Sequence, residues 1–194
     1  MEGLILAGEP FTPAELQALG SRGAVMPLVP GVWARPEAAR RPEVRAEALW
    51  MLGGPVLAGG WTAIASSAAW VLTGGAMPER LHAAVPHFHR LPAGGSPLPW
   101  TLTQSDVAAG PDGQAPAEED VLRIGPLRVT TPERTVEDLL LSPDPDAART
   151  AAAVIAAHGA AGLRERLARH SRRSGVVAAR RRLDVLLGAL EAAG

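Results

Sequence analysis

The sequence lacks lysine, cysteine and tyrosine altogether, so all 19 basic residues of this 194-residue chain are arginine. Without lysine there can be no Walker-type phosphate loop and no Schiff-base nucleophile. Without cysteine there can be no disulfide, thiol nucleophile or thiolate zinc site. Composition alone therefore excludes several large classes of enzyme.

Aromatic residues are also scarce, with five Trp and two Phe, whereas alanine occupies 37 positions. A core built from Ala, Leu and Val suits closely packed helices. Because 47% of the residues are hydrophobic and 20% are charged, we expect a compact protein of one or two domains.

No charged residue occurs from residue 48 to residue 78, so this stretch has to be considered as a possible membrane-spanning helix. Twelve of its residues are Gly, Pro, Ser or Thr, whereas a spanning helix needs about 20 predominantly apolar residues. We therefore expect buried core, including Trp50, Trp61 and Trp70, and no membrane segment. At the N-terminus, Glu2 and the lack of a basic region indicate that there is no signal peptide, which favours a cytoplasmic protein.

The two ends of the chain differ in charge. Residues 1–148 hold 10 Arg and 17 acidic residues, a net charge of −7, while residues 149–194 hold nine Arg and three acidic residues, a net charge of +6. We divide the chain into residues 1–36, an α/β core domain over residues 37–145 and a basic helical segment over residues 146–194.

Residues 1–36 carry signals for one helix and one hairpin. Thr12 as N-cap, Pro13 at the first helical position and Glu15 in a capping box predict a short helix that Gly20 ends. Prolines and a glycine among the apolar residues of 24–34 predict a small hairpin directly after it.

The central part predicts an α/β (α+β) fold, a small mixed sheet packed by helices. Helical spacing covers residues 36–52, and Ser66 or Ser67 caps a second helix that Gly74 and Gly75 end. Strands are expected near residues 56, 81 and 98 and over 121–130. Residues 104–120 have little to bury and are expected to form a surface loop.

A third helix begins after the 121–130 hairpin. Thr131 is its expected N-cap, Pro132 takes the first helical position, and Arg134 and Asp138 are expected to pair four residues apart on its surface. Three more helices, punctuated by glycines, are expected from residue 146 to the C-terminus.

Two motifs resemble the AbiEi family, the antitoxin and transcriptional-regulator component of type IV toxin–antitoxin systems. The first is the SSAAWVLTG segment around Ser67, and the second is IGPLRVTTPERTVEDLL, which covers residues 124–140. The family-motif residues, which we expect to be structural, are Ser67, Thr131, Pro132, Arg134, Thr135 and Asp138.

This resemblance implies an N-terminal winged helix that binds promoter DNA, and an α/β domain that acts as antitoxin without holding its toxin in a stable complex. The chain departs from that pattern in residues 1–36, which leave room for one helix and a hairpin but not for a recognition helix. We therefore expect a truncated, winged-helix-like N-terminus.

The second candidate DNA surface is an arginine cluster in the basic segment. Helical spacing puts Arg166, Arg169 and Arg173 on one side, where they could neutralise phosphates without reading sequence. The alternative is that these arginines are simply solvated or pair with the acidic body. The whole cluster comprises Arg164, Arg166, Arg169, Arg172, Arg173, Arg180, Arg181 and Arg182.

Other chemistry is less well supported by the sequence. His87 and His89 could face one metal from a strand, with His82 nearby, but the prolines around them suggest a loop. We expect no metal, no cofactor and no catalytic residue, and a non-enzymatic regulator that contacts DNA. The alternatives are a protein-interaction module that has lost DNA binding, and the remnant of a nuclease-like protein without its catalytic domain.

Overall fold

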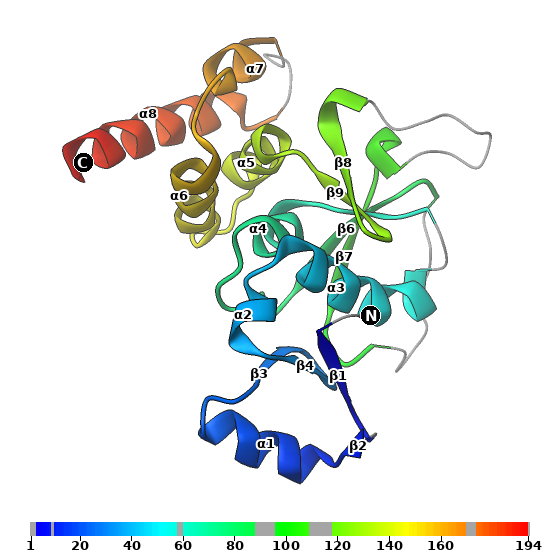
Figure 1. Cartoon of the computed structure of the whole chain (residues 1–194). Coiled ribbons are helices and arrows are strands. Elements are labelled where there is room, and N and C mark those ends of the chain that lie inside the picture. Colours follow the sequence, from blue (N-terminus) through cyan, green and yellow to red (C-terminus); the bar gives the residue numbers. More distant parts are fainter. Residues whose placement is uncertain are drawn as a thin grey trace.

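The computed structural model describes residues 3–8, 10–57, 60–87, 96–108, 118–169 and 174–193. Within these residues the chain has the α+β fold that the sequence predicts, with two mixed sheets and helices around them. In Figure 1 the N-terminal sheet lies at the bottom and the C-terminal helices lie at the top left.

The N-terminal sheet contains two more strand pairings than the sequence indicates. The predicted helix and hairpin are present, and the capping box forms, because the Glu15 N–H donates to Thr12 Oγ1 (3.3 Å) and the Thr12 N–H donates to the Glu15 carboxylate (2.8 Å). Two unpredicted strands precede the helix and give the strand order β2-β1-β4-β3. The elements are β1 (Leu4–Ala7), β2 (Pro10–Phe11), α1 (Pro13–Ser21), β3 (Met26–Val29) and β4 (Val32–Ala34).

The helix expected over residues 36–52 is two helices, α2 (Pro36–Ala39) and α3 (Pro42–Leu57), each beginning at a proline. The strand expected near residue 56 is wrong, since residue 56 lies in α3 and the strand is β5 (Thr62–Ala63). The two glycines at residues 53 and 54 lie inside α3, and Gly53 leaves room for a tryptophan ring. A Cβ on Gly53 would lie 2.6 Å from the Trp61 ring.

Helix α4 (Ala65–Thr73) ends at Gly74 as predicted, but its predicted serine cap is wrong. The N-cap is Ile64, which makes no side-chain cap hydrogen bond. Ser67 is fully buried instead, and its Oγ accepts a hydrogen bond from the backbone N–H of His82 (2.8 Å). The hydroxyl therefore joins the helix to the neighbouring strand.

The central sheet has the strand order β7-β6-β5-β9-β8. Strands β5 and β9 are parallel, as are β6 and β7, whereas the β5–β6 and β8–β9 pairs are antiparallel. The strands predicted near 81, near 98 and over 121–130 are confirmed. They are β6 (Leu81–Val85), β7 (Trp100–Gln104), β8 (Val121–Ile124) and β9 (Leu127–Thr130).

The surface loop expected over residues 104–120 is wrong where the structure describes it. A short 3-10 helix, η1 (Asp106–Ala108), buries Val107 and Ala108, and a second one, η2 (Glu118–Asp120), buries Asp120. Residues 109–117 lie outside the described residues.

The predicted third helix and the three C-terminal helices are confirmed, and they pack against one another and against α4. A second hydrophobic cluster contains Ala69 of α4 together with residues of all four, whereas Trp70 and Val71 of α4 belong to the first cluster, which spans both sheets and α3. The four are α5 (Pro132–Leu141), α6 (Ala147–His158), α7 (Leu163–Arg169) and α8 (Val176–Ala193).

The tryptophans predicted to lie in the core do so. Trp61 and Trp70 are buried, and Trp50, which is partly buried, stacks on Trp61 with 5.9 Å between ring centroids. Among the described residues, none of the helices has the length and apolar character needed to cross a membrane.

Candidate functional site

The exposed part of the predicted arginine cluster lies on α7 and α8, which pack side by side (Figure 1). Arg164, Arg169 and Arg181 are exposed. Arg164 forms an ion pair with Asp184 of α8 (2.9 Å), and both side chains are more than half exposed. Arg172 and Arg173 lie outside the described residues.

Arg166 is not on a solvent-facing stripe, so that part of the prediction is wrong. Its side chain is only 9% exposed, and its guanidinium pairs with Asp120 (2.6 Å) and with Glu137 of α5. It is buried together with Leu163 and Leu167 of the same helix, and its ionic partners come from η2 and α5.

Two further arginines of the cluster bind backbone oxygens of neighbouring helices. Arg180 donates to the carbonyl oxygen of Leu167 in α7 (2.9 Å). Arg182 donates to the carbonyl oxygens of Leu140 (2.8 Å) and Ser142 (2.6 Å) at the end of α5. Both side chains are partly buried, so they hold the helices together as well as carrying charge.

The second family motif builds the beginning of α5. Thr131 is the N-cap, as predicted, and its Oγ1 accepts from the Arg134 N–H (3.3 Å). Pro132 takes the first helical position. Thr135 and Thr130 are fully buried and share a hydroxyl hydrogen bond (2.8 Å), which ties α5 to β9.

Arg134 and Asp138 do pair, but inside the protein rather than on its surface. Arg134 is buried, and its Nε lies 2.9 Å from Asp138 while its Nη1 lies 2.7 Å from Asp120. Asp120 thus accepts from Arg134 with one oxygen and pairs with Arg166 through the other. We call these five side chains the ionic network: Asp120, Arg134, Glu137, Asp138 and Arg166.

The charges and hydrogen bonds within the ionic network shift the pKa values of its members. Burial raises the pKa of Asp120, but the hydrogen bonds and charges of Arg134 and Arg166 outweigh it and hold that pKa below its usual value. Burial likewise lowers the pKa of both arginines, and their carboxylate partners more than reverse this, so both guanidinium groups stay charged. Two cations and three carboxylates therefore sit together in the fold.

A cavity of about 260 Å³ lies beside the ionic network, with Arg134 and Asp138 in its wall. His82, Thr103 and Gln104 line it from β6 and β7. Burial lowers the pKa of His82, and the charge of Arg80 lowers it further against the opposing effect of Asp144. The cavity thus offers a neutral imidazole and hydroxyl and amide groups to a small ligand at neutral pH.

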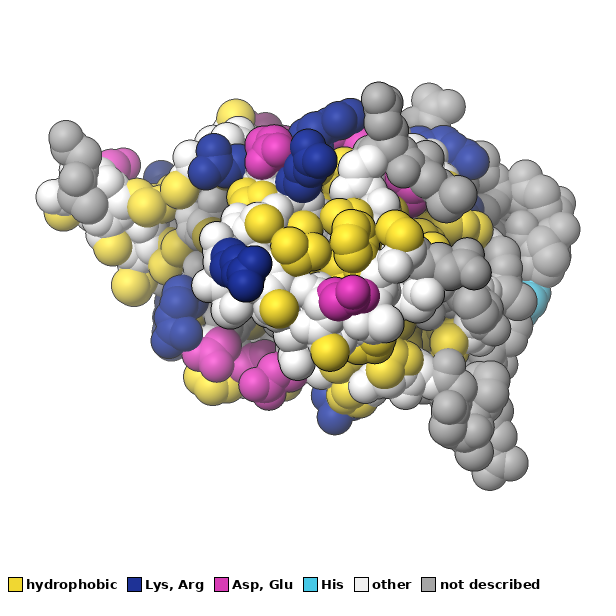
Figure 2. All heavy atoms as spheres, turned by 60° about the horizontal axis from the view of Figure 1, so that its bottom comes forward, with side chains coloured by type: hydrophobic (Ala, Val, Ile, Leu, Met, Phe, Trp, Pro, Cys, Tyr) yellow, Lys and Arg dark blue, Asp and Glu magenta, His cyan; other side chains and the backbone are white. Residues whose placement is uncertain are grey.

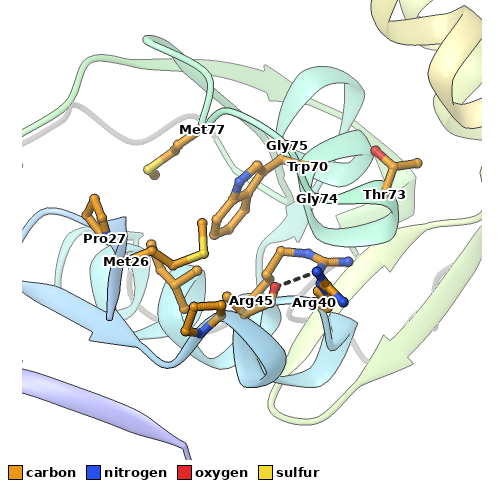
Figure 3. Close-up of a pocket in the computed structure, with 12 residues that line it drawn as sticks. Met26, Pro27, Arg40, Arg45, Trp70, Thr73, Gly74, Gly75 and Met77 are labelled. Carbon is orange, nitrogen blue, oxygen red and sulfur yellow. Dashed lines mark hydrogen bonds between the residues drawn. The ribbon is translucent and has the colours of Figure 1, made fainter. Parts of the chain in front are cut away.

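A separate cavity of about 270 Å³ lies between the N-terminal sheet and α4. Figure 3 shows the Trp70 indole at its centre, with Met26 and Met77 on one side and Arg40 and Arg45 on the other. Sequence reasoning missed these arginines because no spacing rule relates them to Trp70, which is 25 residues beyond Arg45.

The histidines that the sequence analysis considered as metal ligands, without expecting a metal, are only partly described. His87 is exposed, and His89 lies outside the described residues. Among the described residues, no three His, Asp or Glu side chains are placed to hold a metal ion.

No protein-family model matches the chain, and no curated protein is significantly similar to it.

Proposed function

We propose that the protein is a non-enzymatic, antitoxin-like transcriptional regulator of the kind that the AbiEi family represents, and that it contacts DNA through α7 and α8. As a DNA-contacting regulator it would act in the cytoplasm. The observation that carries the proposal is that the C-terminal arginines differ in their exposure to solvent. Arg166 is buried in the ionic network, whereas Arg164, Arg169 and Arg181 are exposed to solvent.

The exposed surface of helix α1 also favours DNA contact through α7 and α8 over contact through the N-terminal sheet. Helix α1 is exposed except at Leu16, Leu19 and Gly20, and Glu15 is its only charged residue. A helix without a basic residue is poorly suited to the major groove, where arginine and polar side chains read base edges. Sequence-independent phosphate contact from α7 and α8 is therefore the expected mode of binding.

The family motifs support the proposal in a second way. Thr131, Arg134 and Thr135 are engaged in capping, ion pairing and hydroxyl bonding, which is the structural role the resemblance implies for them. These roles fit a binding protein whose motif specifies the fold.

The test is DNA binding measured by fluorescence anisotropy with a duplex of about 20 base pairs over a range of salt. The wild-type affinity should fall steeply with salt, and Arg169→Glu with Arg181→Glu should abolish most of it. Arg149→Glu on α6 is the matched control, because its side chain is 84% exposed and belongs to the same basic segment. If the control and the double variant lose affinity equally, the α7–α8 surface is not the site.

The runner-up is a protein-interaction module without DNA contact. In that case the wild-type protein would show no salt-dependent affinity for the duplex in the same titration. A nuclease remnant that keeps a basic surface would also bind the duplex, so this titration separates the regulator from the interaction module but not from that remnant.

A further inference from the structure

Arg45 is a buried cation that no carboxylate contacts in the described part of the chain. It is 4% exposed, and its guanidinium donates to the carbonyl oxygens of Val71 (2.8 Å) and Ala39 (2.8 Å). Burial lowers the pKa of Arg45, against the charge of Glu43. The carbonyl oxygens at the end of α4 carry the negative end of the helix dipole, so backbone oxygens, and no contacting carboxylate among the described residues, accept the hydrogen bonds of this guanidinium.

A second arginine faces the same cavity. Arg40 is exposed at the end of α2, and it forms no ion pair within the described residues. Thr73 and the backbone of Gly74 complete this end of the cavity, and a Cβ on Gly74 would lie 3.3 Å from Arg45 Nη1. The cavity therefore has a cationic end with room for an anionic group.

The other end of the cavity opens into an apolar groove of about 720 Å³. The cavity and the groove share Met26, Leu28 and Met77, and the groove continues along Trp33, Pro78 and Leu98. Figure 2, which brings the N-terminal sheet forward, shows hydrophobic side chains gathered at the centre of this face, with arginine and acidic side chains among them. Small-molecule sites in proteins typically measure about 300–1,000 Å³.

We propose that the cavity and groove together bind a small amphipathic carboxylate, with its apolar chain along the groove and its carboxylate between Arg40 and Arg45. A carboxylate accepts paired hydrogen bonds from a guanidinium, which the exposed Arg40 can offer. The Nε and Nη2 atoms of Arg45 already donate to carbonyl oxygens at the end of α4, so Arg45 adds its charge and the one N–H of Nη1 that does not donate to Ala39. A carboxylate therefore suits this end better than a neutral polar group. The proposal stands independently of DNA binding.

A small molecule fits the groove better than a peptide does. Strand β3 is at the edge of the N-terminal sheet, where an extended peptide could add as a further strand. Pro27 lies in β3 and has no N–H, and a proline at an edge hinders such pairing. The groove therefore holds its occupant through side chains.

The experiment is a titration of the full chain with sodium decanoate below its micelle concentration, followed by tryptophan fluorescence and calorimetry. Trp70 and Trp33 line the cavity and the groove, so they report on occupancy. Saturable one-to-one binding is expected for decanoate. Acetate, which has no apolar chain, and decylamine, which has no carboxylate, should bind at least about ten-fold more weakly.

The matched variants are Arg40→Gln and Arg41→Gln. Both residues are exposed neighbours, but Arg41 does not line the cavity and lies beside Glu43 (4.0 Å). Arg40→Gln should weaken decanoate binding about ten-fold, and Arg41→Gln should leave it unchanged. Leu98→Ser, in the groove, should weaken decanoate without changing the preference for acid over amine. Absence of decanoate binding, equal binding of decylamine, or equal effects of the two arginine variants would each overturn the proposal.

Discussion

Arg164 and Arg166 are two residues apart on α7, yet their environments are opposite. Arg164 makes an ion pair in solvent, where a pair contributes about 0–1 kcal/mol. Arg166 is buried against Asp120 and Glu137, and removal of one partner from a buried pair costs about 3–5 kcal/mol because charges are left without a counter-ion. The same residue type thus serves two purposes within one helical turn.

We expect Arg166→Ala to lower the free energy of unfolding by about 3–5 kcal/mol and Arg164→Ala to lower it by no more than about 1 kcal/mol. Urea unfolding followed by circular dichroism measures both. Equal stability of the two variants would mean that the ionic network is solvated and contributes little.

Asp120 makes stability depend on pH at the acidic end. Because its pKa is lower in the folded protein than in the unfolded chain, its contribution is complete above about pH 4 and is lost as the pH falls through the folded pKa. Urea unfolding between pH 7 and pH 3 should therefore show a smaller acid loss in Asp120→Asn than in the wild type. Asp146→Asn, at an exposed position, should follow the wild type.

At the scale of elements, Gly53 and Gly54 provide a test of how α3 meets the tryptophans. Both lie inside the helix, where alanine is favoured over glycine by up to about 1 kcal/mol. A Cβ on Gly53 would lie 2.6 Å from Trp61 and 3.0 Å from Trp100, whereas one on Gly54 would make only an ordinary contact with Trp50 at 3.7 Å.

Gly54→Ala should therefore raise the melting temperature, and Gly53→Ala should lower it through overpacking that costs about 1–3 kcal/mol. Differential scanning calorimetry on the two variants compares them directly. A stabilised Gly53→Ala protein would show that Trp61 can move aside at little cost.

Local sequence signals predicted those elements whose ends are defined by their own residues. Thr12 and Thr131 each begin a helix through a cap that can be recognised without knowledge of the fold. Strand β5 was missed because it has two residues and no detectable alternation. The extension of α3 through Gly53 and Gly54 to Leu57 lies beyond the predicted 36–52 helix, and the Trp61 ring that lies against Gly53 comes from a later segment.

The candidate site was less predictable than the fold for the same reason. The Arg134–Asp138 pair follows from its spacing, but its burial depends on Asp120, which belongs to a different element. Arg166 and Glu137 are 29 residues apart and meet only when α7 packs on α5. No sequence signal pointed to Arg45, because its acceptors are backbone oxygens of α2 and α4.

At the scale of the whole molecule, α4 connects the two halves. Ala68, Trp70 and Val71 belong to the hydrophobic cluster that spans both sheets, while Ala69 belongs to the cluster of α5 to α8. Helix α4, which has nine residues, thus contributes side chains to both hydrophobic cores. Neither core is complete without this helix.

We therefore expect the chain to unfold in one cooperative step. All five tryptophans lie at or before residue 100, so fluorescence reports on the two sheets, whereas far-UV circular dichroism is dominated by helices, including α5 to α8. Urea transitions followed by the two signals should coincide, as they do when no intermediate is populated. Separate midpoints, with the dichroism change resolved from the fluorescence change, would instead indicate that α5 to α8 unfold separately from the two sheets.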